Sequence, residues 1–354
     1  LTIRTPVDFG VLILVIMSAI SLWLTALTNV TYFQVMRIWV GIALFYTIAN
    51  WTNSFSRLRL TAWLAVGSAV TLGIIAIIGV DWAFDKLPII PASIYSFLPS
   101  ILENWFHRNV MGGYLVLFLP PMIGILLFAW QRLSWLARGF LLLSTVFVLS
   151  VLVLTQSRGA LIAFAVAFGL LLIFRWRWAW VLAPLGVVGL LVVVYYLGPS
   201  RLLNFISSGV SLGGIDGRLE VWSRAVYMIQ DFPALGIGMG LFSDVADILY
   251  PFFIQEPGSI PHAHNILLQI TVDLGIPGLI AWISSILGIL LVSFRVYRLG
   301  VRSDIPWLAG LSAGLFLSQV ALLVHGMFDA VTWGLMRLSP LVWLLWGIAA
   351  AAGI

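Results

Sequence analysis

The chain has 354 residues, of which 62% are hydrophobic and 9% charged, with a formal net charge of +5. Such a small number of charged residues cannot cover the surface of a soluble domain of this size. The composition therefore excludes a water-soluble protein. Repeated runs of about 18 or more apolar residues predict an all-α, polytopic integral membrane protein. The basic residues are scattered through short loops, so the charge does not indicate nucleic-acid binding. The lack of cysteine excludes disulfides and thiolate chemistry.

About ten segments are apolar and long enough to be membrane helices: 7–28, 35–51, 61–80, 111–130, 139–154, 159–174, 178–197, 264–294, 307–328 and 340–352. They divide a single membrane domain into seven helices over 1–197, a long outer loop with short helices over 198–263, and three helices over 264–354. The segment starting at His264 is long for one crossing. Gly275 and Pro277 predict a break in it, with a half-helix before the proline.

Orientation follows from the distribution of lysine and arginine, which concentrate on the cytoplasmic side of membrane proteins. Alternating the loops places one basic set together: Arg4, Arg57, Arg59, Arg132, Arg138, Arg175, Arg177, Arg295, Arg298 and Arg302. These loops are therefore expected to be cytoplasmic. The opposite, outer side carries the long loop and a smaller group of arginines, where positive charge is normally scarce: Arg158, Arg201, Arg218, Arg224 and Arg337.

Two of the outer arginines are candidate anion ligands. Arg158 lies in the turn TQSRGAL, close to membrane depth, where an arginine needs an anionic partner or a wet cavity. Arg218 opens GRLEVWSRAVYMI, whose apolar spacing predicts a helix with the arginine in its first turn, beside free amides. The planar guanidinium suits phosphate and keeps its proton. The alternatives are an interfacial, snorkelling Arg158 and a surface ion pair of Arg218 with Asp216 or Glu220.

A histidine motif precedes the eighth apolar segment. In PHAHN (261–265), a histidine at a helix start near the membrane is a candidate proton acceptor, because its pKa is close to ambient pH. His262 and His264 also raise the question of a metal, but residues two apart do not share a helix face and no HExxH accompanies them. We therefore expect no metal and no cofactor. Asn265 is suited to capping the following helix.

A second histidine, His325, stands four residues before Asp329 in HGMFD, at the outer end of the ninth apolar segment. This spacing puts both residues on one face of a helix. They are expected to form either an ionisable pair inside the bundle or a pair that orients the site. The sequence has no Asp-x-Asp motif, P-loop, GxSxG elbow or dinucleotide fingerprint. We interpret the glycine-rich GIGMG (236–240) as flexible backbone or tight packing.

In an ordered set, these motifs resemble the O-antigen ligase family, which shares a superfamily with the O-antigen polymerases. The matching stretches are TQSRGAL (155–161), GRLEVW (217–222), DFPALGIGMGLF (231–242), HAHNILLQITVDLGIPGLI (262–280) and HGMFD (325–329). HRNVMGGYL (107–115) is similar to a family segment that precedes a helix, which makes Asn109 a supporting candidate. The family has about twelve membrane helices, so the resemblance, with a chain starting at Leu1 and not Met, implies that an N-terminal piece is missing.

The resemblance implies metal-independent transfer of a glycan from undecaprenyl diphosphate to an acceptor hydroxyl, such as that of lipid A-core, in lipopolysaccharide biosynthesis. The site would lie on the periplasmic face of the bacterial inner membrane. Arg158 and Arg218 would bind the diphosphate, and His264 would act as general base. One base without a carboxylate nucleophile implies inversion at the anomeric centre. Supporting residues would be Asn109, Trp222, Asn265, His325 and Asp329.

Three alternatives remain open at this point. An O-antigen polymerase that extends a lipid-linked glycan would use the same donor chemistry, so the arginines and His264 do not separate it from a ligase. An anion or bicarbonate-type transporter would predict inverted repeats and interrupted helices that meet at the midplane, and the sequence shows no internal repeat. A purely structural membrane scaffold would leave the outer arginines and histidines without a role.

Overall fold

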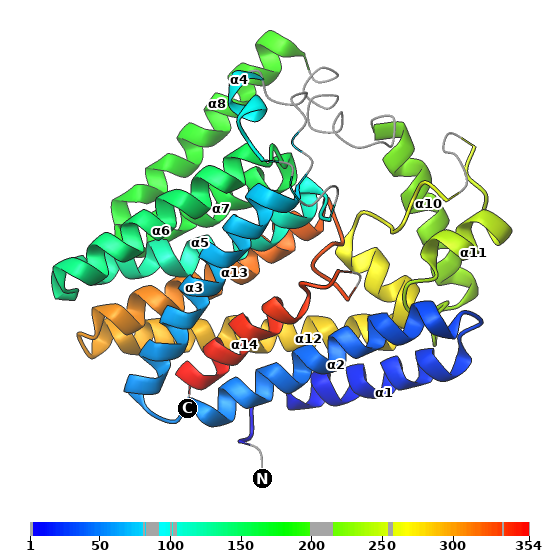
Figure 1. The fold of residues 1–354 in the computed structure, drawn as a ribbon, viewed down its shortest axis with the longest axis horizontal. Helices are drawn as coiled ribbons and strands as arrows, with labels where there is room; N and C mark the ends of the chain where they lie inside the picture. Colours follow the sequence, from blue (N-terminus) through cyan, green and yellow to red (C-terminus); the bar gives the residue numbers. More distant parts are fainter. Residues whose placement is uncertain are drawn as a thin grey trace.

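The computed structural model describes residues 3–80, 82, 92–99, 101, 105–198, 215–253, 258–334 and 336–353. Within them the fold is all-α and polytopic, and each of the ten predicted segments falls on a helix (Figure 1). In this described part of the chain, eight helical stretches are long and apolar enough to cross a membrane: α2 (Thr28–Trp51), α3 (Phe55–Gly79), α5 (Arg108–Ala129), α6 (Trp135–Leu154), α7 (Arg158–Arg175), α8 (Leu182–Leu197) together with the 3-10 turn before it, α12 (Ile266–Arg302) and α13 (Pro306–Gly326). Helices α1 (Asp8–Leu24) and α14 (Pro340–Ala352) are apolar but shorter.

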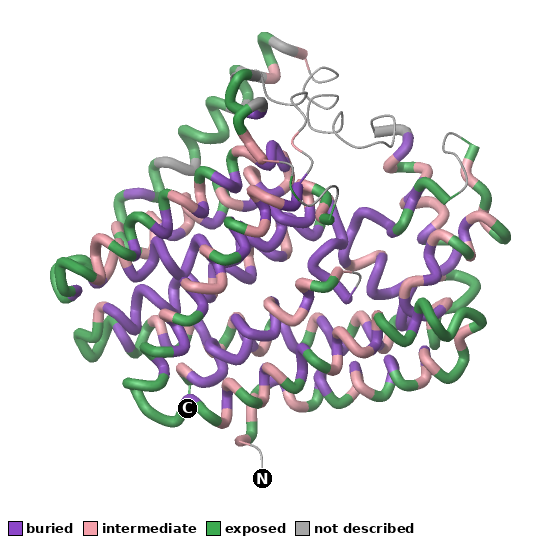
Figure 2. Tube along the Cα trace, in the orientation of Figure 1, coloured by how far each residue is buried: buried purple, intermediate pink, exposed green. Residues whose placement is uncertain are grey.

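The central pair of the bundle is α5 and α13, which are buried along most of their length (Figure 2). Their backbones approach closely at glycines. A Cβ atom on Gly314 would lie 2.2 Å from the Cα of Pro121, and one on Gly310 would lie 2.4 Å from the carbonyl oxygen of Gly124. Membrane helices associate through such small residues, because lipid supplies little hydrophobic driving force between helices.

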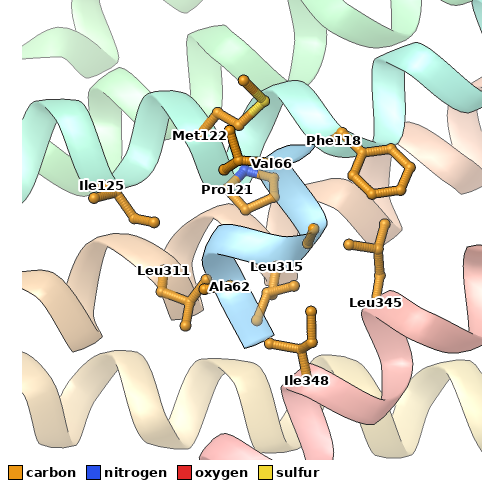
Figure 3. A pocket seen from close by; sticks show the side chains of 11 residues that line it. Ala62, Val66, Phe118, Pro121, Met122, Ile125, Leu311, Leu315, Leu345 and Ile348 are labelled. Carbon is orange, nitrogen blue, oxygen red and sulfur yellow. The ribbon is translucent and has the colours of Figure 1, made fainter. Parts of the chain in front are cut away.

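The bundle interior is tightly packed, whereas its margin is exposed to the surroundings. Between α3, α5, α13 and α14 remains an apolar cavity of only about 10 Å³, lined by residues such as Phe118, Leu315 and Leu345 (Figure 3). A space of that size without polar partners holds no ordered ligand. At the edge, α8 exposes apolar side chains, including Leu185 and Leu191, as expected of a lipid-facing helix.

The predicted basic loops lie at one end of the bundle. Arg132, which follows α5, pairs with Asp304, which follows α12, at 3.5 Å. Arg175 at the end of α7 donates to the carbonyl of Leu127 near the end of α5 at 3.0 Å. We call this the basic end. The starts of α5, α7 and α12 and the end of α13 lie at the opposite end, together with α10 (Ile215–Asp231) and α11 (Phe242–Leu249) (Figure 1).

The predicted break in the long helix is present at Gly275, whose φ of 69° and ψ of −176° are not helical. The connection between α10 and α11 fills the break: the N–H of Ile237 donates to Val272 O and the N–H of Ile276 donates to Pro233 O, both at 2.8 Å. These bonds satisfy backbone groups that the break frees from the helix. The sequence left GIGMG (236–240) as either flexible backbone or tight packing. The structure shows tight packing.

Replacing Gly275 with alanine is expected to destabilise the protein. Its backbone conformation is essentially restricted to glycine, and a Cβ there would lie 2.6 Å from the backbone of Ala234. A positive φ combined with an extended ψ costs a residue other than glycine about 1–3 kcal/mol. Thermal unfolding in detergent should show a lower midpoint. The matched control is Gly67→Ala, where no atom lies within 4 Å of the added Cβ and the midpoint should not fall. Equal midpoints for the two variants would contradict the packing described here.

Candidate active site

The loop that carries the two histidines is held in a constrained conformation. His264 has a φ of 49°, which is uncommon for a residue other than glycine. Directly after it, Asn265 Oδ1 accepts hydrogen bonds from the N–H groups of Leu267 and Leu268 at 3.0 and 3.2 Å. Asn265 is therefore the N-cap of α12, as its sequence position predicted. The cap fixes where the helix begins and so fixes the position of His264.

His262 and His264 share a single carboxylate, that of Asp329. The Nδ1 atom of His262 accepts from the backbone N–H of His264 at 3.2 Å, so neutral His262 carries its proton on Nε2. That Nε2 faces Asp329 Oδ1 at 3.5 Å, and the Nδ1 of His264 lies 3.9 Å from the same oxygen. With Nδ1 of His264 turned to the carboxylate, Nε2 is the nitrogen left for a substrate. This is the geometry of a base oriented by a third group.

Burial controls the protonation of this cluster, since at most 8% of each residue is exposed. Burial, together with the neighbouring His262, Arg218 and His107, lowers the pKa of His264 to about 3 against the opposing effect of Asp329. Burial also lowers the pKa of His262. For Asp329, burial raises the pKa, but the three histidines around it outweigh burial and the net shift is downward. Both imidazoles are therefore neutral and the carboxylate is ionised at neutral pH.

The position of Asp329 corrects the expectation that it shares a helix face with His325. Helix α13 ends at Gly326, and Asp329 lies in the turn beyond it. The chain then runs back into the bundle, where Tyr114 Oη donates to Val331 O and Trp333 Nε1 donates to Asp273 Oδ2, both at 2.9 Å. Asp329 is therefore held by an anchored, buried segment, and its N–H still donates to the carbonyl of His325 at 3.0 Å.

Arg218 lies on the buried face of α10, one turn before Val221. Val221 and Ala225 form a small apolar core with α11 and α12, which presses this face of α10 against the bundle. The guanidinium donates through Nη1 to the carbonyl of Phe328 at 3.3 Å, one residue before Asp329. Glu220, one of the two residues considered for a surface pair with Arg218, lies 3.6 Å from Arg224. Burial lowers the pKa of Arg218 below its usual value, against the opposing effect of Asp329.

Arg158 is the first residue of α7 and is half-buried at the same end of the bundle. Its neighbour Gly159 packs on Phe328: a Cβ at Gly159 would lie 3.1 Å from the Cβ of Phe328 and 3.6 Å from His325. Arg158, through its neighbour Gly159, and Arg218 therefore both lie near the turn at Phe328. The His325 ring fills the space left by Gly113 of α5, where an added Cβ would lie 2.6 Å from its Cε1.

The other predicted residues take varied positions. Asn109 lies in the first turn of α5, so the NVMGG stretch is part of the helix and does not precede it; its N–H donates to His107 Nδ1 at 3.2 Å. Trp222 lies on α10 beside the apolar core. Arg337 is exposed. Arg201 and Leu1 lie outside the described residues.

Buried nitrogens without hydrogen-bond partners mark this region. Among the described residues, they include Arg218 Nε, Trp222 Nε1, His264 Nδ1 and His325 Nδ1. Because unpaired buried donors and acceptors are uncommon, Arg218 Nε, which lies beside the turn at Phe328, and the two histidine nitrogens are candidates to bind a polar ligand.

Sequence reasoning missed three polar groups within the membrane helices. Asp273 and Gln269 lie on the half-helix of α12 and are fully buried. Arg37 lies inside α2 and donates to Gln34 at 3.3 Å. The signal in each case was a polar or charged residue inside an apolar segment, which marks a functional candidate.

The cluster of His262, His264 and Asp329 is also the group of residues in the described chain that is able to hold a metal, with ligand atoms within 4.8 Å of one another. Tetrahedral zinc with bonds of about 2.0–2.1 Å brings ligand atoms to roughly 3.3 Å from each other. The measured separations of 3.5 and 3.9 Å from Asp329 are wider.

Part of the chain is similar to a known protein family. Residues 143–283 match the family model described as O-antigen ligase. The O-antigen ligase match contains Arg158, Arg218 and His264, whereas His325 and Asp329 follow it in the chain. It implies a glycosyltransferase-like activity of the O-antigen ligase or polymerase type, with lipid-linked glycan and acceptor substrates in the membrane. No curated protein matches the chain.

The buried neutral histidines predict a loss of stability in acid. Below a pH of about 6.5 the unfolded chain binds protons on His262 and His264 that the folded protein does not take up. The free energy of unfolding should therefore fall as the pH decreases from about 6.5 towards 3. Thermal unfolding midpoints across this range should fall less steeply for the His262→Gln/His264→Gln variant. The same slope in both proteins would show that these histidines are not neutral in the fold.

Proposed function

We propose that the protein is a metal-independent, inverting glycosyltransferase of the O-antigen ligase type. It moves a glycan from undecaprenyl diphosphate to an acceptor hydroxyl such as that of lipid A-core. The observation that carries the proposal is the convergence on the turn at Phe328 and Asp329 of a buried guanidinium, that of Arg218, and an oriented neutral histidine, His264. The family match supports the same class of reaction.

The transfer step follows from these positions. The acceptor oxygen attacks the anomeric carbon on the side opposite the diphosphate, and His264 Nε2 takes the proton of the hydroxyl. The bond between the anomeric carbon and the phosphate oxygen breaks, and its electron pair leaves with the diphosphate. Arg158 and Arg218 stabilise the added negative charge, which is the larger contribution in reactions of this kind. One displacement without a covalent intermediate inverts the configuration.

Donor binding is also expected to strengthen the base. A diphosphate beside Arg218 brings negative charge close to His264, and an opposite charge raises the pKa of an imidazole. The pKa of His264, held at about 3 by burial, would then move towards the range in which a histidine works best as general base. Proton transfer is thereby coupled to the presence of the donor, which limits side reactions with water.

We place the protein in the bacterial inner membrane with the site on the periplasmic face. The support is the basic end, where Arg132 and Arg175 lie, opposite to the end that carries His264. Basic loops face the cytoplasm in membrane proteins.

A reconstituted assay tests the proposal with an undecaprenyl diphosphate glycan, candidate acceptors and EDTA. We expect transfer of one preassembled glycan to the acceptor, at a rate that EDTA does not change. A ladder of lengthening lipid-linked glycan would instead identify a polymerase, which shares the donor chemistry. Failure of the purified protein to consume any lipid diphosphate donor would overturn the proposal.

A further inference from the structure

The carboxylate of Asp273 is buried, lies outside the turn at Phe328 and Asp329, and connects three segments near that turn. Asp273, in the half-helix of α12 before the break, is 0% exposed. It accepts from Gln269 Nε2 at 2.9 Å, from Trp333 Nε1 at 2.9 Å and from the backbone N–H of Gly240 at 3.4 Å. These donors belong to α12, to the segment after α13 and to the connection between α10 and α11.

Two of these bonds lead directly to the catalytic residues. Gln269 Oε1 accepts from the backbone N–H of Ala263, the residue between the two histidines, at 2.7 Å. Trp333 stands four residues after Asp329 in the buried segment that positions that carboxylate. Asp273 therefore connects the loop of His264 to the segment of Asp329 through one hydrogen-bond network.

The direction of each bond in the network is fixed. Every bond to Asp273 has an N–H donor, so the carboxylate acts only as acceptor. The amide nitrogen of Gln269 must then face Asp273, which leaves its oxygen for Ala263 N–H. Reversing the polarity at one position breaks the bond between residues 269 and 273, and reversing it at both positions restores that bond. The longer bond from Gly240 N–H, which uses the same oxygen of Asp273, is lost whenever the polarity at residue 273 is reversed.

We propose that Asp273 is a positioning residue that sets the separation between His264 and Asp329 during glycosyl transfer. The inference rests on the proposed function. Displacement of a catalytic group by about 1 Å costs on the order of 10²-fold in rate. The 3.9 Å separation between His264 Nδ1 and Asp329 Oδ1 is therefore sensitive to the network that holds both loops.

The test is a double-mutant cycle with Asp273→Asn, Gln269→Glu and the double variant. Asp273→Asn should lower kcat by about 10- to 100-fold with little change in the donor KM. Gln269→Glu puts two carboxylates side by side and should be worse. In the double variant the asparagine N–H₂ donates to the glutamate, whose second oxygen still accepts from Ala263, so kcat should rise well above that of either single variant. Recovery should be incomplete, because the N–H of Gly240 has lost its acceptor.

A matched control separates positioning from general stability. Gln319 of α13 accepts from Trp346 Nε1 at 2.7 Å, which is also a buried side-chain bond from a tryptophan, but it lies outside this network. Gln319→Leu should lower the thermal midpoint and leave kcat unchanged. If Gln269→Glu does not fold, Trp333→Phe replaces it, because it removes one bond to Asp273 and should lower kcat without raising the donor KM.

The outcomes distinguish this inference from the proposed function. Wild-type transfer with an unchanged kcat in Asp273→Asn would overturn the positioning role alone. A lowered kcat that does not rise in the double variant would also overturn it, since the polarity of the bond would then be irrelevant. No transfer by the wild type would overturn both.

Discussion

His264→Ala should lower kcat for glycan transfer by about 10²–10⁴-fold, the contribution typical of a general base. The imidazole is neutral, its Nδ1 faces Asp329 at 3.9 Å, and its Nε2 is left to accept the proton of the acceptor hydroxyl. Alanine removes the proton acceptor but leaves Arg158 and Arg218 in place. Single-turnover measurements with the enzyme in excess over the donor and with saturating acceptor would report the chemical step.

The control for this variant is its affinity for the donor. Because His264 acts on the acceptor, His264→Ala should bind undecaprenyl diphosphate glycan about as tightly as wild type. A variant that transfers glycan at the wild-type rate would exclude His264 as the base. A variant that loses donor binding in proportion to its rate would assign it a binding role instead.

Arg218→Ala should weaken donor binding and lower kcat/KM by about 10²–10³-fold, the loss found when a group that stabilises developing charge is removed. Its guanidinium is buried, donates to Phe328 O at 3.3 Å and retains an unpaired buried Nε for a ligand. Arg218→Lys keeps the charge but not the planar fork, so it should recover only part of the activity. Titration of donor binding and initial rates would measure both effects.

The matched control is Arg132→Ala. Arg132 is also an arginine beside an acidic residue, Asp304 at 3.5 Å, but it lies exposed at the basic end of the bundle. Its removal should leave donor binding and kcat/KM unchanged, because exposed ion pairs contribute little and the donor site lies at the other end. Equal losses for Arg132→Ala and Arg218→Ala would indicate a general effect of positive charge on the membrane lipid.

The helices were largely predictable from the sequence because membrane crossing imposes a length and an apolar composition that are visible locally. The predicted segment 340–352 coincides with α14, and Gly275 with Pro277 correctly predicted the break in α12. The predicted helix ends differ from the observed ones, because capping and tertiary contacts determine where a helix begins and ends. Helix α5 starts three residues before the predicted 111, and α13 ends two residues before the predicted 328.

The site was predictable only in part. Motifs identified Arg158, Arg218 and His264, and the structure places all three at one end of the bundle. The sequence did not predict that His262 would lie beside Asp329 together with His264. This contact depends on the positive φ of His264 and on the turn after Gly326. Asp273 went unnoticed for a similar reason, since its partners Gly240 and Trp333 are distant in the sequence.

The most direct test of the account is a structure with an undecaprenyl diphosphate donor bound. It should show the diphosphate on the guanidinium groups of Arg158 and Arg218, beside the turn at Phe328, with the anomeric carbon on the side of His264 Nε2. A diphosphate bound at the basic end near Arg132 and Arg175, or bound away from His264, would contradict the proposed mechanism.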